Sequence, residues 1–148
     1  LGLADCESVC DLDAIYMDDH GLPVVIEDKC TACGDCVDAC PKDLFSLHPV
    51  SHRLWVACKN LEKGEKVIQD CQVGCDACGR CAVDAPQGVI AMIDNLPVVD
   101  YDRNHNAKEA IERCPTGAIV WYDDKRGPVA GRAARRVVRQ SARRAINT

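Results

Sequence analysis

Aromatic residues are scarce in this chain, whose 148 residues include one Phe, two Trp and three Tyr. The hydrophobic fraction of 47% counts all twelve cysteines, so fewer side chains are available for an apolar core than that value implies. Units of about fifty to seventy residues with so few large apolar side chains are seldom stable through burial alone. We therefore expect covalent or metal cross-links to stabilise the fold.

Long apolar runs are also missing. No stretch approaches the roughly 20 apolar residues of a membrane-spanning helix, and residues 1–13 lack the basic start and apolar run of a signal peptide. Because disulfide scaffolds belong to oxidising compartments, we expect a reducing, cytoplasmic location, with attachment to the inner membrane face as an alternative. The first residue is Leu1 rather than Met, and we expect a processed product or part of a longer polypeptide.

Charge is distributed unevenly. Residues 125–148 contain eight basic and no acidic side chains, so the first 124 residues hold the other ten basic and all 23 acidic ones, a net charge of −13. Such an acidic body argues against nucleic acid as the main ligand. We expect the basic tail to form an amphipathic helix that docks onto an acidic partner surface; an anionic membrane or a solvated terminus are the alternatives.

The chain contains two copies of one unit. The tetrapeptide Leu-Pro-Val-Val at 22–25 recurs at 96–99, and Cys40-Pro41 recurs as Cys114-Pro115 at the same offset of 74. Hydrophobic patterns and turn residues predict two strands, a short helix and a last strand in each copy. The predicted strands are 14–17, 23–26, 44–47, 89–93, 97–99 and 118–121, the helices 35–39 and 107–113, and the region between the copies contains a strand at 54–57 and a helix at 61–69.

The strongest motif is a run of cysteines, Cys30-x2-Cys33-x2-Cys36-x3-Cys40-Pro41. Three thiolates two residues apart, followed by a fourth before proline, are typical of bacterial iron–sulfur sites, in which the fourth cysteine binds the other cluster. Zinc is the alternative, although it usually takes paired C-x2-C knuckles. By this exchange rule, one [4Fe–4S] cluster takes Cys10, Cys30, Cys33 and Cys36.

The second copy carries Cys71-x3-Cys75-x2-Cys78-x2-Cys81, and Ala85 stands where a fourth cysteine would follow. The positions equivalent to Cys30, Cys33 and Cys36 are also without sulfur. These four losses form the complete ligand set of one cluster, and they are Ala85, Asn104, Ala107 and Ala110. The set for the other cluster is complete and consists of Cys75, Cys78, Cys81 and Cys114. We therefore predict one cluster in the second copy.

Four cysteines remain after these assignments. Cys6 and Cys40 are predicted to share a third cluster, whose other ligands either precede Leu1 or are supplied by Cys58 and Cys71. Cys58 and Cys71 could instead be buried free thiols. The sequence thus predicts two or three [4Fe–4S] clusters bound through cysteine. The four histidines are expected to be isolated and not to be ligands.

Several segments resemble the polyferredoxin part of the B subunit of the Rnf electron-transport complex, a family of bacterial-type [4Fe–4S] proteins. They are residues 1–6 (Leu-Gly-Leu-Ala-Asp-Cys), 28–34 (Asp-Lys-Cys-Thr-Ala-Cys-Gly), 56–58, 63–66 and 71–75 (Cys-Gln-Val-Gly-Cys). The resemblance covers about four-fifths of the chain. It departs from that family at the four missing ligands and in the basic tail.

The resemblance implies an α+β fold of tandem ferredoxin-like βαββαβ modules. We predict a first module at 1–47, a connector at 48–73, a second module at 74–124 and the basic tail at 125–148. The implied function is a non-catalytic iron–sulfur subunit that relays single electrons between a redox donor or acceptor protein and the catalytic subunit of an oxidoreductase complex. A zinc-stabilised interaction module and an iron–sulfur regulator are the other hypotheses.

Overall fold

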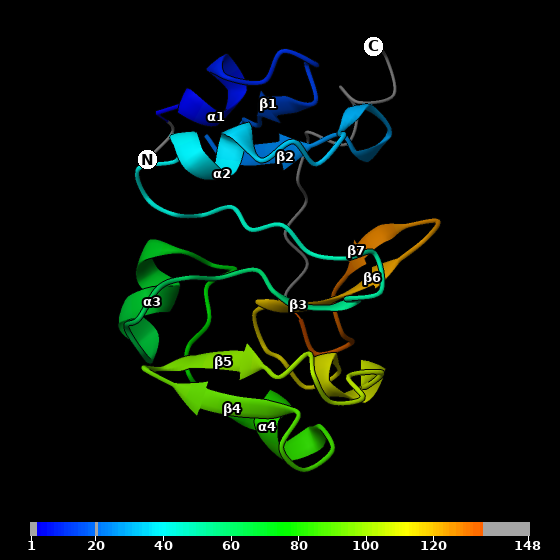
Figure 1. The fold of residues 1–148 in the computed structure, drawn as a ribbon. Coiled ribbons are helices and arrows are strands. Elements are labelled where there is room, and N and C mark those ends of the chain that lie inside the picture. The colour runs from blue at the N-terminus through cyan, green and yellow to red at the C-terminus, as the bar shows by residue number, and fades with distance from the viewer. Residues whose placement is uncertain (1–2, 20, 135–148) are drawn as a thin grey trace. The chain divides into compact units, whose positions relative to one another are not determined.

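The structure is a computed structural model that describes residues 3–19 and 21–134 (Figure 1). The chain divides into two compact units between His48 and Pro49. The described residues up to His48 are named unit 1, and residues 49–134 are named unit 2. The predicted connector lies in unit 2 from Pro49 onward. The basic residues beyond position 134 lie outside the described residues.

Unit 1 contains a β-hairpin flanked in sequence by short helices. The helix at Asp5–Ser8 packs against the helix at Asp35–Ala39, so the two cysteine-bearing segments of unit 1 lie side by side. In the hairpin turn, the carboxylate of Asp18 accepts the backbone N–H of Leu22 at 2.9 Å, which closes the turn. The elements are α1 (Asp5–Ser8), β1 (Ile15–Met17), β2 (Pro23–Val25), the 3-10 turn η1 (Glu27–Lys29) and α2 (Asp35–Ala39).

Unit 2 contains the same succession of a helix, a hairpin and a 3-10 turn, and it adds a sheet. Its hairpin turns through Asp94 and Asn95, both with positive φ, as the tightest hairpin turns require. A second, three-stranded antiparallel sheet has the order β3-β6-β7. The elements are β3 (Leu54–Val56), α3 (Glu65–Asp70), α4 (Arg80–Asp84), β4 (Ile90–Ile93), β5 (Leu96–Val99), the 3-10 turn η2 (Lys108–Ile111), β6 (Ile119–Asp123) and β7 (Gly127–Val129).

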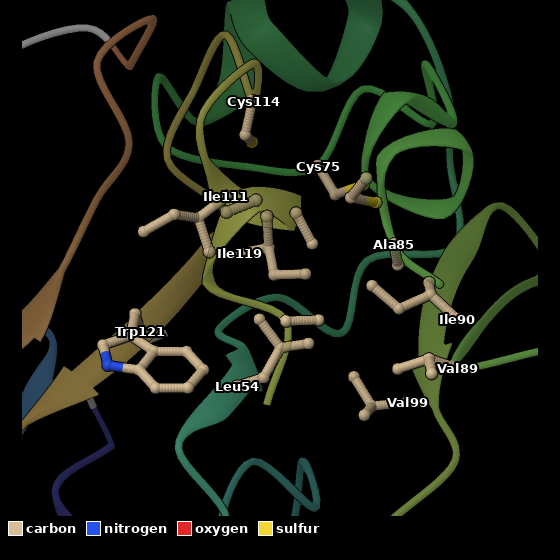
Figure 2. Packing of buried hydrophobic residues seen from close by; sticks show 14 residues of the cluster. Leu54, Cys75, Ala85, Val89, Ile90, Val99, Ile111, Cys114, Ile119 and Trp121 are labelled. Atoms are coloured by element: carbon tan, nitrogen blue, oxygen red, sulfur yellow. The ribbon is translucent and has the colours of Figure 1, made fainter. Parts of the chain in front are cut away.

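The main hydrophobic core lies in unit 2 (Figure 2). Leu54 on β3, Ile111 on η2 and Ile119 on β6 are almost fully buried at its centre. Unit 1 has less to bury: among its described residues, the buried hydrophobic ones are Cys6, Ala14 and Ile15. The two units therefore differ in how much of their stability apolar burial can supply.

Most predicted strands are confirmed to within about two residues, and the helix at 35–39 is confirmed. The strand predicted at 44–47 is wrong: in the described part of unit 1 the sheet contains only β1 and β2, and residues 44–47 pair with neither. The helix predicted at 61–69 begins only at Glu65, since Gly64 has a φ of 72° and cannot be helical. The helix predicted at 107–113 is the shorter 3-10 turn η2.

Four elements were not predicted: α1, η1, α4 and β7. The first three are short and lie within or next to cysteine motifs, so their apolar periodicity is too brief to detect. β7 lies in the segment predicted to be part of the basic tail, where it pairs with β6. Among the helices described, none combines the length and apolar character needed to span a bilayer.

The difference between the two cores generates a prediction about metal dependence. When metal is removed anaerobically, backbone amides of the β1–β2 hairpin and α2 should lose hydrogen-exchange protection, because unit 1 buries little apolar surface. Amides of β3 and β6 should keep most of theirs, since Leu54 and Ile119 remain buried. Equal loss in both units, measured by hydrogen exchange with mass spectrometry, would contradict this interpretation.

Candidate metal centres

The two cysteine loops have the same backbone geometry. In unit 1, Ala32 and Gly34 have φ values of 58° and 92° on either side of Cys33, and in unit 2 Ala77 and Gly79 have values of 61° and 74° around Cys78. A left-handed conformation costs a non-glycine residue roughly 1–2 kcal/mol. That both alanines adopt it, each directly before the middle cysteine, indicates that the curvature of these loops serves a site.

The four cysteines predicted as a set in unit 2 line one cavity. Cys75 and Cys78 lie on the loop before α4, Cys81 lies in α4, and Cys114 follows η2. The empty space at this cavity is about 300 Å³ when open solvent is counted. Met92, Pro97, Ala118 and Ile119 are its apolar lining residues. Cys75, Cys81 and Cys114 are buried, whereas Cys78 is exposed at its edge. Sulfurs from two distant segments of the sequence thus share one site.

The electrostatics of this cavity oppose free thiolates. Burial, and to a smaller extent the negative charges of Cys114 and Cys75, raise the pKa of Cys81 to about 11. Burial is also the main cause that raises the pKa of Cys75 and of Cys78. Without a cation these thiols keep their protons at neutral pH, so metal binding must release them. The donor set, four cysteine sulfurs in an apolar cavity, fits a [4Fe–4S] cluster.

In unit 1, Cys30, Cys33 and Cys36 lie close together on the loop before α2 and at its start. Cys30 and Cys33 are exposed, and Cys36 lies half-buried in α2. Burial raises the pKa of Cys36, and the nearby negative charges of Cys30 and Cys33 add to the shift. Cys10 lies two residues after α1, where its Sγ accepts the Ala14 backbone N–H at 3.4 Å. Its membership of this ligand set stays a prediction.

Cys6 and Cys40, the predicted pair, line a second cavity of about 500 Å³, open solvent included. Leu3, Met17 and Phe45 are among the other residues around it. Cys6 is buried in α1, which raises its pKa, and the negative charge of Cys40 contributes. The structure therefore brings these two sulfurs to one place, where two further donors would be needed for a cluster.

Cys58 and Cys71 occupy different surroundings. Cys58 follows β3, and its Sγ accepts the backbone N–H of Cys75 at 3.3 Å. Cys71 is exposed at the end of α3. Within the described residues, no three His, Cys, Asp or Glu side chains gather tightly enough to hold a single metal ion.

Three of the four positions predicted to have lost a ligand lie in the core. Ala85, Ala107 and Ala110 are buried in the hydrophobic core of unit 2, together with Leu54. Asn104 is exposed, and its side-chain oxygen accepts the N–H of Asn106. Because protein cores are close-packed, the three alanines are surrounded by apolar contacts.

Sequence reasoning missed two features near these sites. His52 stacks on Tyr101 with ring centroids 3.9 Å apart and His105 contacts both edge-on, so these histidines are not isolated. Residues 130–134 pass over the end of η2, where the N–H of Ala133 donates to the Glu112 carbonyl. A Cβ on Gly131 would collide with the Ile111 carbonyl, so only glycine fits there. In the sequence, Gly131 is only a small residue within the basic segment, and nothing there indicates its contact with Ile111.

Comparison with known proteins shows what this chain is similar to. Residues 4–53 match the family described as the 4Fe-4S dicluster domain. The B subunit of the Na(+)-translocating ferredoxin:NAD(+) oxidoreductase complex of Acetobacterium woodii is 38% identical over 80% of this chain and 36% of its own length. The B subunit of the proton-translocating ferredoxin:NAD(+) oxidoreductase complex of Clostridium ljungdahlii is 41% identical over 80% of this chain and 43% of its own. The chain is a homologue of these B subunits.

A third B subunit, from an ion-translocating oxidoreductase complex of Methanosarcina acetivorans, is 34% identical over 80% of the chain and 45% of its own length. The resemblance predicted from the sequence is thereby confirmed, and so is the prediction of [4Fe–4S] binding. The chain spans less than half the length of these B subunits.

The raised pKa of Cys81 predicts how the metal-free protein responds to pH. Iodoacetamide reacts with thiolates, so Cys81 should be alkylated only as pH approaches 11, whereas exposed Cys33 is open to the reagent. In the unfolded chain the Cys81 thiol ionises near 9, so between about pH 9 and 11 only the folded state keeps this proton and stability falls as pH rises. Alkylation of Cys81 as fast as Cys33 in folded protein at pH 8, measured by peptide mass spectrometry, would contradict this.

Proposed function

We propose that this chain is an iron–sulfur electron-transfer segment of an oxidoreductase complex. The observation that carries the proposal is the convergence of Cys75, Cys78, Cys81 and Cys114 on one cavity, in a chain homologous to B subunits of ferredoxin:NAD(+) oxidoreductase complexes. These four cysteines would hold one cluster, and Cys30, Cys33 and Cys36 with Cys10 a second. A [4Fe–4S] cluster supplies one-electron transfer with little rearrangement.

Both units are proposed to be ferredoxin-like modules. The element order of unit 2 from β3 to β6, strand, helices, two strands, 3-10 turn and strand, supports the βαββαβ arrangement. Its outer strands β3 and β6 pair antiparallel, with Trp55 opposite Val120, and its inner strands β4 and β5 form the hairpin. In unit 1 the equivalent hairpin lies between the segments that carry Cys6 and Cys36.

A third cluster is proposed at the cavity of Cys6 and Cys40. It is supported by the burial of Cys6 and by the effect of Cys40 on the pKa of Cys6. The cavity lining includes no other cysteine among the described residues, so two ligands must come from elsewhere.

The residues around the unit 2 cavity suit electron transfer. Met92, Pro97 and Ile119 are apolar residues of its lining, which lowers the local polarity and strengthens the influence of nearby charges. The carboxylate of Asp76 lies beside the site and accepts the Cys78 N–H at 3.2 Å. Exposed Cys78 provides the edge nearest to solvent, through which a partner could exchange electrons.

Partner recognition is proposed to be electrostatic. Residues 1–48 contain eleven acidic and two basic side chains, a net charge of −9, and every acidic one except Asp18 is exposed. Residues 49–134 are nearly neutral, with twelve acidic and eleven basic side chains. The field of unit 1 would steer a donor or acceptor protein with a basic docking face, while the basic tail would bind an acidic surface of the catalytic subunit.

Iron analysis of variants tests the cluster assignment. Protein purified anaerobically should contain at least about eight iron atoms with equal acid-labile sulfide, about four for each cluster. Cys81→Ala and Cys33→Ala should each lose about four, because each removes a ligand from a different site. Val83→Ala, an exposed position on the same helix as Cys81, is the matched control and should lose none.

Two results would end this proposal. Colourless protein with stoichiometric zinc and no sulfide would establish the zinc-stabilised interaction module instead. Iron that does not fall in either cysteine variant would show that these residues are not ligands. Low-temperature EPR of dithionite-reduced protein should show the signal of reduced clusters, with one component absent from Cys81→Ala.

A further inference from the structure

Cys58 is hydrogen-bonded to a residue of the unit 2 site but is not among the residues that line its cavity. It follows β3, is half-buried, and packs against the hydrophobic core. Its Sγ accepts two backbone N–H groups, from Cys75 at 3.3 Å and from Asn60 at 3.5 Å. The residues that line the cavity include Cys75 but not Cys58. This thiol therefore contacts a ligand residue from the protein side.

A second contact ties the same two segments together. The backbone N–H of Gly64 donates to the carbonyl oxygen of Asp76 at 2.9 Å. Residues 58–64 are thus hydrogen-bonded to the ligand loop at two successive residues, Cys75 and Asp76. Asn95 Nδ2 holds this segment in turn, since it donates to the Leu61 carbonyl at 2.8 Å. Residues 58–64 therefore hold the start of the ligand loop in place, and Asn95 holds residues 58–64 in place.

The direction of the Cys75 amide matters for redox chemistry. Backbone N–H groups that point at the sulfurs of a cluster stabilise its more negative, reduced form and raise the reduction potential. Because the Cys75 N–H donates to Cys58, it is directed away from the cavity. The Cys58 sulfur, which carries partial negative charge, also lies next to the proposed ligand Cys75. Both effects disfavour an added electron.

On the basis of the function proposed above, we propose that Cys58 is a positioning residue that orients Cys75 and lowers the reduction potential of the unit 2 cluster. It acts through its hydrogen bond to the Cys75 N–H and does not bind iron in this site. A purely structural thiol would only fill space beside Val56 and the core. The two roles differ in their response to a substitution that keeps the acceptor.

The test uses the full chain with its clusters, purified anaerobically as wild type, Cys58→Ala, Cys58→Ser and Val56→Ala. Val56 is the matched control, since it is also half-buried against the same core. Iron content is measured first, and the potential is then followed by EPR-monitored titration of the signal that is absent from Cys81→Ala. We expect full iron in all four proteins, a more positive potential in Cys58→Ala, and wild-type potentials in Cys58→Ser and Val56→Ala.

The outcomes separate this inference from the proposed function. An unchanged potential in fully loaded Cys58→Ala overturns the inference, and so does an equal upward shift in Cys58→Ser, because the serine hydroxyl can still accept the amide. If Cys58→Ala loses iron, full iron and a wild-type potential in Cys58→Ser still support it, whereas loss of about four irons in both overturns it. Wild-type protein without iron and sulfide would contradict the proposed function instead.

Discussion

The structure depends on the convergence of thiols from distant parts of the sequence. In unit 2, burial of Cys75 and Cys81 raises their pKa values, and the negative charge of each neighbouring sulfur opposes ionisation of the others. Such an arrangement is electrostatically unfavourable for thiolates unless a cation compensates them. The left-handed alanines add strain to the same loops. An iron–sulfur cluster would reverse this balance, because it converts the repulsion among sulfurs into metal–ligand bonds.

The two copies have met this requirement differently. In unit 2, Ala85, Ala107 and Ala110 have joined a core that includes Leu54, Ile111 and Trp121. Apolar packing among these residues stabilises unit 2 without a metal. Unit 1 keeps all the cysteines of its motif and buries few apolar side chains among its described residues. The acidic surface of unit 1 would disfavour an added electron on a cluster there. The same cluster would have to supply stability that apolar burial does not.

Much of this could be predicted from the sequence because cysteine spacing and turn residues are local signals. The spacing of Cys75, Cys78 and Cys81 places them close together in one short segment, and the repeat offset pointed to Cys114 as the fourth residue at their cavity. Asp94 and Asn95 marked the hairpin turn. The strand expected at 44–47 failed, because pairing depends on a neighbour that local composition does not reveal.

Other features were not predictable because they depend on contacts between segments far apart in sequence. The hydrogen bond from Cys75 to Cys58 joins residues 17 positions apart, and nothing in the spacing distinguishes Cys58 from a spare thiol. The contact of Gly131 with Ile111 joins the end of the described chain to η2. Stacking of His52 on Tyr101 likewise joins two loops. Each requires the folded arrangement of unit 2 to be known.

The most direct test is anomalous diffraction from anaerobic crystals, recorded at the iron and zinc absorption edges. The account predicts a compact group of iron peaks within bonding distance of the Sγ atoms of Cys75, Cys78, Cys81 and Cys114. A single zinc peak at that position, or disulfide bonds among these four sulfurs, would contradict it.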